Sequence, residues 1–394
     1  MSELLAPAGN IEALDAAIGE GADAVYMGLK SFNARLRSSN FAWNQFEAAV
    51  QAVHRQKKKI YVTVNTVIEE RETERLYRFL SYLDKVGPDG LIVQDFGIIR
   101  MCQEFFPNLE LHASTQMNIA SAKAANLMGK EGFQRVVLAR ELGLKEIQDI
   151  KANSNVELEV FVHGALCVCE SGLCLFSSYL GGKSANRGMC AQACRRFYQA
   201  EYDGGIEQGY YFSPNDLQLI EKIPDLVNIG VESFKIEGRM KSAYYTAICA
   251  NTYRMAMDEY LKNPSEYKFN ENWLRELNSV SHRDYATGFY FDNPMDNPQT
   301  VTNMGYLREK AYLCVAQSDS DADGYAVFMQ KNKLSVGDSV ELITPGRCGT
   351  PFVVEQMLDL KGEKIVSAPH PSMLFKIKVP FGVKAGDILR SSDR

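Results

Sequence analysis

The first 165 residues alternate between short β-rich runs and amphipathic helical patterns, and this alternation most constrains how the chain folds. The predicted strands, seven here and an eighth further on, lie at 3–6, 24–28, 59–64, 90–94, 109–113, 135–139, 157–163 and 233–237. Two intervening segments carry apolar residues at helical spacing, namely Phe46, Ala49, Val50, Val53 and Leu76, Phe79, Leu80, Leu83. Strands separated by helices of this length form parallel βαβ units.

Eight strands with seven crossovers predict an α/β fold, with a (β/α)8 TIM-barrel-like domain over residues 1–241. The alternative is an open, doubly wound sheet. Its dinucleotide-binding form loses support, because no Gly-x-Gly-x-x-Gly follows the first strand.

One gap between predicted strands is much longer than the others. About 70 residues, 164–232, separate the seventh strand from the eighth. In a barrel, the loop that follows a strand lies on the C-terminal face, where active sites are found. We therefore expect this insertion on the catalytic face.

The rest of the chain changes character twice. Residues 242–304 are expected to form a helical connector. Residues 305–394 carry short β runs separated by turns such as Gly337-Asp338 and Gly386-Asp387, which predict a small antiparallel β-barrel. These runs lie at 311–316, 325–329, 339–343, 352–357, 374–379 and 387–389.

Charge and hydropathy restrict the possible partners. The 394 residues include 43 Lys and Arg against 49 Asp and Glu, a net charge of −6. This excludes a generally basic coat for nucleic acid but leaves room for a local basic groove. The start of the sequence lacks a secretory pattern, and no apolar run has the length of a membrane span, so we expect a cytoplasmic protein without membrane contact.

Five of the nine cysteines lie within the 28 residues from Cys167 to Cys194. They are Cys167, Cys169, Cys174, Cys190 and Cys194. In a cytosolic chain, such a cluster predicts a metal or redox site. Zinc prefers Cys-x2–4-Cys pairs, and of the main spacings only Cys190-x3-Cys194 fits, so the uneven spacing favours an iron–sulfur cluster. The alternative is a set of buried, inert cysteines.

The cysteine segment resembles the signature of the collagenase-like peptidase family, whose catalytic type is unsettled. The matching residues are Glu159, Phe161, Gly164, Ala165, Leu166, Cys167, Gly172, Cys174 and Ser177, while Phe176 stands where an aliphatic residue is usual. Further similar segments are 5–9, 32–35, 112–116, 186–188 and 235–239. The resemblance covers nearly the whole chain.

The resemblance implies an RNA-modifying activity, because several members of this family are RNA hydroxylases. The closest branch carries out prephenate-dependent 5-hydroxylation of the tRNA wobble uridine. By this resemblance, a [4Fe-4S] cluster would be held by Cys167, Cys174 and Cys190, with Cys194 or Cys169 as fourth ligand. The implied partners are prephenate, a tRNA anticodon loop, and a paralogous subunit or a second copy of the chain.

Several side chains at predicted strand ends are candidates for this chemistry. The two carboxylates of prephenate call for arginine forks, and the candidates for substrate binding are Arg140, Arg239, Arg187, Arg35 and Asn65. His112, His163 and Glu237 are candidates for catalysis, the histidines as general acids or bases and Glu237 as the residue that orients Arg239 or a histidine. Structural ion pairs and structural histidines are the alternatives.

Basic and aromatic residues gather beside the cysteines in the sequence. They are Lys183, Arg187, Arg195, Arg196, Phe197, Tyr198, Tyr210 and Tyr211, with Arg239 and Lys241 further on. Phosphate contacts beside stacking rings suit a single-stranded anticodon loop. The alternative is a solvated loop over an aromatic core.

Two other functions compete with RNA hydroxylation. A peptidase would use Cys167 as nucleophile with His163 nearby, although neither His-Glu-x-x-His nor Gly-x-Ser-x-Gly is present. The other is an iron–sulfur or zinc protein that acts in assembly or binding without turnover.

Overall fold

The computed structural model describes residues 2–291, 299–301, 306–308 and 310–392. The chain divides into two compact units. The barrel unit contains Met1–Leu14, Ala22–Lys241 and Arg283–Gly305, and the C-terminal unit contains Asp15–Gly21, Ser242–His282 and Tyr306–Arg394. The expected helical connector, 242–304, is therefore shared between the two units, and its end at 304–305 lies outside the described residues.

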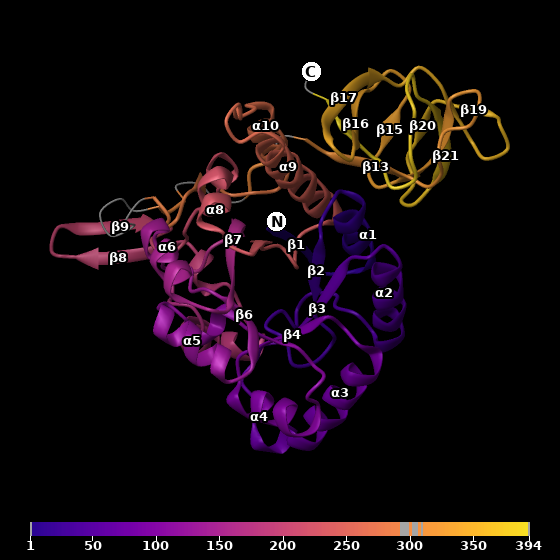
Figure 1. Ribbon diagram of the computed structural model, residues 1–394. Coiled ribbons are helices and arrows are strands. Elements are labelled where there is room, and N and C mark those ends of the chain that lie inside the picture. The colour runs from indigo at the N-terminus through magenta and orange to yellow at the C-terminus, as the bar shows by residue number, and fades with distance from the viewer. Residues whose placement is uncertain (1, 292–298, 302–305, 309, 393–394) are drawn as a thin grey trace. The chain divides into compact units, whose positions relative to one another are not determined.

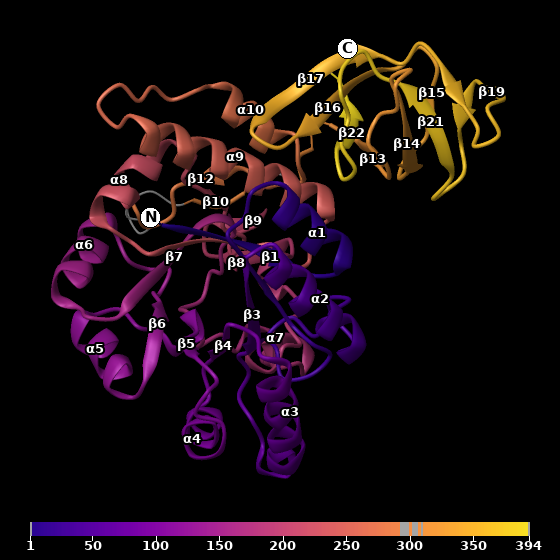
Figure 2. The same cartoon turned by 45° about the vertical axis from the view of Figure 1, so that its right-hand side comes forward.

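All eight strands predicted for the barrel form, and they are parallel (Figures 1 and 2). Strand β11 pairs with β1 on one side and with β7 on the other, which closes the sheet into a TIM-like barrel. The strands are β1 (Glu3–Ala8), β2 (Ala24–Met27), β3 (Lys59–Val64), β4 (Gly90–Val93), β5 (Leu111–Ala113), β6 (Phe133–Val137), β7 (Glu157–Ala165) and β11 (Ser233–Ile236). The closed barrel is confirmed over the open sheet.

Helices connect these strands because their apolar stripes pack on the sheet. They are α1 (Ile11–Gly19), α2 (Trp43–Arg55), α3 (Thr73–Val86), α4 (Phe96–Phe105), α5 (Ala122–Lys130) and α6 (Leu144–Asn153). The buried residues of α2 and α3 are the eight that the spacing predicts, Phe46, Ala49, Val50, Val53, Leu76, Phe79, Leu80 and Leu83. Single 3-10 turns, η1 (Glu70–Glu72) and η2 (Thr115–Met117), complete two connections.

The insertion after β7 is shorter than the expected 164–232. Residues 164 and 165 continue β7, and α8 (Ile223–Ile229) is the crossover helix into β11. Between them lie α7 (Phe176–Gly181), the 3-10 turns η3 (Ala185–Arg187), η4 (Ala193–Arg195) and η5 (Ile220–Lys222), and the hairpin β8 (Tyr198–Tyr202) and β9 (Gly205–Gly209). Strand β10 (Asp216–Gln218) runs antiparallel to the end of β7 and pairs with β12 (Tyr285–Ala286).

The C-terminal unit contains two helices, α9 (Ala243–Lys262) and α10 (Asn272–Asn278), and an antiparallel sheet in the order β17-β16-β22-β13-β14-β21-β18-β19. Its strands are β13 (Tyr312–Ala316), β14 (Tyr325–Gln330), β16 (Ser339–Thr344), β17 (Arg347–Val353), β18 (Met357–Leu358), β19 (Lys364–Ile365), β21 (Leu374–Lys378) and β22 (Ile388–Ser391). A separate pair joins β15 (Leu334–Ser335) to β20 (Ser367–Ala368).

This sheet confirms the antiparallel β structure predicted for the C-terminal part. One strand is displaced, because β17 occupies 347–353 where 352–357 was expected. The sheet surrounds an apolar core that includes Phe328 and Phe375. Its end strands β17 and β19 are not paired with each other within the described ranges, so no hydrogen-bonded closure into a barrel is present there.

The sequence predicts no membrane-spanning segment, and helices of the structure bear on this prediction. In the part of the chain that the structure describes, no helix combines the length and apolar character needed to span a bilayer.

Candidate functional site

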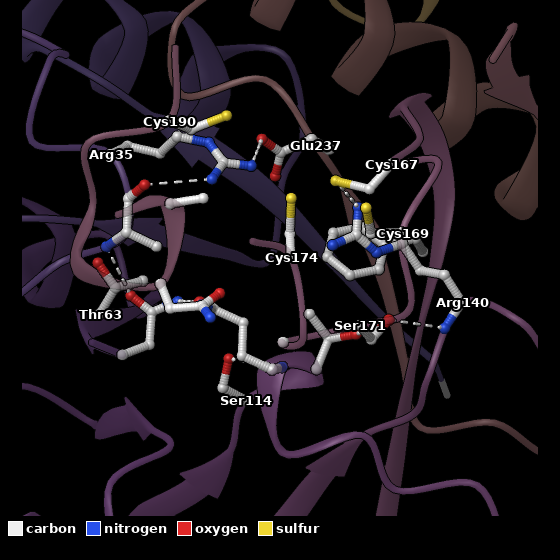
Figure 3. Close-up of a pocket in the computed structure, with 18 of the residues that line it drawn as sticks. Arg35, Thr63, Ser114, Arg140, Cys167, Cys169, Ser171, Cys174, Cys190 and Glu237 are labelled. Atoms are coloured by element: carbon white, nitrogen blue, oxygen red, sulfur yellow. Dashed lines mark hydrogen bonds and ion pairs between the residues drawn. The ribbon is translucent and has the colours of Figure 1, made fainter. Parts of the chain in front are cut away.

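A cavity opens at the carboxyl ends of the barrel strands (Figure 3). Its walls come from the ends of most of the barrel strands and from the insertion after β7. This is the face on which TIM-barrel enzymes carry their catalytic groups. The cavity thus lies on the C-terminal face of the barrel, where the sequence predicts the site.

All five clustered cysteines line this cavity. Cys167 is exposed, and Cys169, Cys174, Cys190 and Cys194 are partly exposed. Figure 3 shows four of these sulfurs around one space. The alternative of buried, inert cysteines applies instead to Cys102, Cys249 and Cys314, which are buried.

Two glycines allow the cysteine loop to reach this position. Gly164 has φ +106° and Gly172 has φ +79°, the left-handed region that side chains disfavour. A Cβ at Gly164 would overlap the carbonyl oxygen of Glu237, and one at Gly172 would overlap that of Gln116. The loop therefore packs directly on the backbones that follow β11 and β5.

The second half of the loop is held by Ser177. This buried hydroxyl accepts a hydrogen bond from the backbone N–H of Ala191 at 3.0 Å, and it lies 3.9 Å from the Sγ of Cys190. Ser177 belongs to the signature, and this contact gives it a structural role. It ties α7 to the segment that carries Cys190.

The thiols differ in their electrostatic surroundings. The Nη1 atom of Arg140 lies 3.5 Å from the Sγ of Cys167, and this guanidinium lowers the pKa of that thiol. Burial raises the pKa of Cys194 to about 11, and burial together with Cys174 raises that of Cys169 to about 12. Cys167 is therefore more easily ionised than Cys169 or Cys194, which suits a metal ligand.

An ion pair crosses the cavity beside the thiols. The Nη2 atom of Arg35 lies 3.1 Å from Oε1 of Glu237, whose Oε2 accepts a hydrogen bond from the Tyr26 hydroxyl at 3.1 Å. Burial raises the pKa of Glu237, but Arg35, Arg239 and Arg140 together hold it below its ordinary value. Glu237 is thus an anion that orients Arg35, whereas the sequence suggested that it orients Arg239 or a histidine.

Two guanidinium groups facing the cavity form no direct ion pair with a carboxylate among the described residues. Arg239 is 4% exposed and donates to the oxygens of Thr63 at 2.9 Å and Asn33 at 3.3 Å. Burial, reinforced by Arg35, lowers its pKa to about 10. Arg140 contacts the Cys167 sulfur and the ring of Phe161. One carboxylate, Glu237, acts on the three guanidinium groups of Arg35, Arg140 and Arg239, and this excess of positive charge marks a place for an anionic ligand.

The cavity also contains residues that the sequence did not single out. Lys235 lies in β11, shortly before the sequence candidates Glu237 and Arg239, and lines the cavity with them. The Nζ atom of Lys235 lies 2.7 Å from Oε1 of the fully buried Glu159. The spacing of 235, 237 and 239 could have identified Lys235 as a cavity residue. No sequence pattern could have identified Tyr26, because it lies in an apolar strand pattern.

Three sequence candidates do not line the cavity. His112 is buried, with its Nε2 atom 2.9 Å from Glu110 and its ring against Tyr61. His163 is buried in β7, with its ring against Tyr285. Arg187 pairs with Glu72 at 2.9 Å and donates to the Val67 carbonyl oxygen. The structure therefore does not bring these side chains together with the thiols.

Asn65 does line the cavity, in contact with a residue from another strand end. It follows β3, and its Nδ2 atom donates to Oε1 of Gln116 at 2.9 Å. The Oδ1 atom of Asn65 accepts from the backbone N–H of Ala34 at 3.0 Å. These amides form a neutral wall of the cavity.

The chemistry of the donor set fits a thiolate-held cluster. Five thiols from one loop face a single cavity, and the arginines beside Cys167 favour its ionised form. No three His, Cys, Asp or Glu side chains of the described residues already stand as ligands of one metal ion. A cluster places each thiolate on a different iron, so it does not require that arrangement.

Exposed aromatic and basic side chains occur in the same insertion. The rings of Phe176, Tyr198 and Phe212 contact one another with centroids 5.3 to 6.2 Å apart, and Phe197 packs against Tyr210. Lys183 and Arg196 are exposed. Arg195 instead binds backbone oxygens of Leu166 and Pro214, so it holds the loop together.

Known proteins resemble this chain over nearly its full length. The family described as "Peptidase family U32" matches residues 9–300, and "Peptidase family U32 C-terminal domain" matches residues 309–390. The Bacillus subtilis tRNA hydroxylation protein P1 is 34% identical over 397 residues, covering 98% of this chain and 94% of that protein.

Two further relatives carry different names. The Escherichia coli 23S rRNA 5-hydroxycytidine C2501 synthase is 40% identical over 263 residues, which cover 66% of this chain and 40% of that protein. The Porphyromonas gingivalis protein named collagenase is 30% identical over 411 residues, covering 100% of this chain and 98% of that protein. These matches confirm the resemblance seen in the cysteine signature, and the chain belongs to peptidase family U32.

Proposed function

We propose that this chain is an RNA hydroxylase that converts a tRNA wobble uridine to 5-hydroxyuridine. The observation that carries the proposal is the shared cavity of five thiols and two guanidinium groups without a direct ion pair at the C-terminal face of the described barrel. Relatives named as a tRNA hydroxylation protein and as an rRNA 5-hydroxycytidine synthase support it.

The proposed cofactor is a [4Fe-4S] cluster on Cys167, Cys174, Cys190 and Cys194. Replacing C5–H by C5–OH is a two-electron oxidation of the base that also needs a hydroxyl donor and an electron acceptor, and a cluster would relay the electrons, which no side chain does. Cys169 is the alternative fourth ligand. Both Cys169 and Cys194 line the cavity, so its geometry does not select between them.

The proposed co-substrate is prephenate, a dicarboxylate. Arg239 has a buried guanidinium whose hydrogen-bond partners are neutral oxygens, and Arg140 reaches the same cavity. Each can bind a carboxylate without first breaking an ion pair. Arg35 is less available, because Glu237 occupies it.

The proposed partner is a tRNA anticodon loop. Exposed Phe197 and Phe212 offer rings on which unstacked bases pack, and exposed Lys183 and Arg196 offer phosphate contacts. A paralogous subunit or a second copy of the chain remains a further proposed partner, and a cytoplasmic location without membrane contact is part of the same proposal.

A peptidase is the second candidate, favoured by the relative named collagenase. A Cys167 nucleophile would need a general base close by. No histidine lines the cavity within the described ranges, and the Cys167 sulfur lies beside an arginine. Peptide hydrolysis that persists after complete removal of metal would favour this reading.

The test is nucleoside analysis of tRNA from a strain that lacks this chain and related hydroxylases. We expect wild-type protein to restore 5-hydroxyuridine or its derivatives, measured by mass spectrometry. Cys174→Ser should restore none and should lose bound iron, while the barrel still unfolds cooperatively, because Cys174 lies in a loop outside the barrel core. Full activity of Cys174→Ser without iron would overturn the cluster-based reaction.

A further inference from the structure

We propose that the Asn65–Gln116 amide pair reads the base, selecting uridine over cytidine by presenting a hydrogen-bond donor to the 4-position of the pyrimidine. This inference rests on the proposed function, since it concerns the nucleotide that the cavity receives. It identifies which side chain discriminates two bases that differ only at the 3- and 4-positions of the ring.

The polarity of the amide pair is fixed by the backbone. A backbone N–H can only donate, so the Asn65 atom 3.0 Å from the Ala34 nitrogen must be the oxygen Oδ1. The other Asn65 atom is then the amide nitrogen, and its partner at 2.9 Å must be the oxygen Oε1 of Gln116. The remaining Gln116 atom is therefore Nε2, a donor.

This donor is not used elsewhere in the described residues. Gln116 lines the cavity and is partly exposed, and its Oε1 already accepts from Asn65. Its Nε2 has two N–H groups and no hydrogen bond to the protein in the part of the chain described. It is thus available to a ligand in the cavity.

The backbone on both sides of the pair is held firmly. Gln116 lies in η2, where its backbone N–H donates to the Ser114 hydroxyl at 3.2 Å. The side-chain hydroxyl of the preceding residue, Thr115, donates to the Leu138 carbonyl oxygen at 3.1 Å. Gly172 of the cysteine loop packs against the carbonyl of Gln116. A fixed backbone limits how far the amide can move to suit the wrong base.

The two pyrimidines present opposite groups to such a donor. Position 4 of uracil is a carbonyl oxygen, which accepts a hydrogen bond, whereas position 4 of cytosine is an amino group, which donates. An enzyme acting on a base reads its pairing edge inside the pocket. A Gln116 donor satisfies uracil and faces another donor in cytosine, so cytidine binding leaves both groups unpaired.

The test inverts this polarity in two independent ways. Gln116→Glu replaces the donor by a carboxylate oxygen. Asn65→Asp keeps the bond to Ala34 but turns an acceptor toward Gln116, so that the Gln116 amide rotates and presents its oxygen. Asn118→Asp is the matched control: it adds the same charge two residues after Gln116, at a φ of 55° that Asp tolerates, and does not line the cavity.

The readout is 5-hydroxyuridine and 5-hydroxycytidine in two versions of one tRNA, with U or with C at the wobble position. We expect each inverting variant to lower the ratio of uridine to cytidine hydroxylation at least tenfold, a change that one mismatched buried hydrogen bond accounts for. Asn118→Asp should keep the wild-type ratio. Thermal unfolding and iron content identify variants that fold and are loaded.

The outcomes separate this inference from the proposed function. If wild-type protein hydroxylates uridine but every folded variant keeps its ratio, or loses both reactions equally, base reading by the pair is wrong. If neither inverting variant folds, Gln116→Ala is the test, because it removes the donor without adding charge. It should also lower the ratio of uridine to cytidine hydroxylation. If wild-type protein hydroxylates no RNA, the proposed function itself fails.

Discussion

Arg239 carries a buried positive charge that forms no direct ion pair among the described residues, and the carboxylate that offsets it, Glu237, is shared with Arg35 and Arg140. Its guanidinium is 4% exposed and bonds to the neutral oxygens of Thr63 and Asn33. Removing a charge from water without a counter-charge destabilises a fold. A ligand that supplies further negative charge explains why a buried guanidinium stands at this position.

We predict that Arg239→Met lowers hydroxylation at least about 30-fold, because an anionic ligand loses a buried charged partner. The same change should alter the free energy of unfolding little, because it removes the desolvation cost of a buried cation together with that cation's attraction to Glu237. Activity assays and urea unfolding of the metal-loaded protein measure the two effects.

Arg187→Met is the matched control, and it should show the opposite pattern. Its guanidinium pairs with Glu72 and lies outside the cavity, so the variant should lose up to about 1 kcal/mol of stability and keep most of its turnover. Equal losses of activity in the two variants would remove the distinction between them.

The sequence identifies individual residues unevenly. Cysteines are recognisable because they cluster, and Arg140 and Arg239 because they follow strands. Tyr26 could not be found, since a tyrosine inside an apolar strand looks like core. His112 and His163 were expected at the site because they end strands, but strand position does not say whether a side chain faces the barrel interior or its mouth.

The cysteine loop is the element that joins fold to chemistry. It packs on the backbone of η2 through Gly172 and on the residues after β11 through Gly164. The eight barrel strands follow from hydrophobic patterning, because each must bury apolar side chains in the same layer. The path of the cysteine loop does not follow from such patterning. Its contacts depend on close approaches between backbones, and these leave no periodic pattern in the sequence.

We predict that Gly172→Ala prevents the loop from seating, since the new methyl group would overlap the Gln116 carbonyl at a φ of +79°. The variant should lose bound iron and hydroxylation, while its circular dichroism stays that of a folded barrel. Gly182→Ala is the control, because Gly182 also has positive φ, +60°, but open space around its Cα. Full iron occupancy in Gly172→Ala would contradict the account of the loop.

The whole molecule should become less stable as pH rises through neutrality, for a reason in the C-terminal unit. Glu20 is 4% exposed, and its Oε2 atom lacks a hydrogen-bond partner in the described residues. Burial, together with the charges of Asp387 and Glu276, raises its pKa from 4.5 to about 8. The folded protein therefore holds a proton that the unfolded chain releases above pH 4.5.

The direction of the pH effect follows from this difference. Stability due to protonated Glu20 is fully present below about pH 4.5 and is lost as pH rises through about 8. We predict that Glu20→Gln, which cannot ionise, is more stable than wild type at pH 8.5 by on the order of a few kcal/mol, with a much smaller difference at pH 5. Thermal unfolding at both pH values measures this, and parallel pH profiles would contradict it.

The central claim is that the cavity thiols hold an iron–sulfur cluster for RNA hydroxylation. Its most direct test is anaerobic purification of the full chain, followed by iron, acid-labile sulfide and zinc analysis with a visible spectrum. The account predicts about four irons and four sulfides per chain with absorption typical of such clusters, all lost in Cys174→Ser. One zinc per chain with no iron or sulfide would contradict it. The cavity would then be interpreted as a hydrolytic or structural metal site.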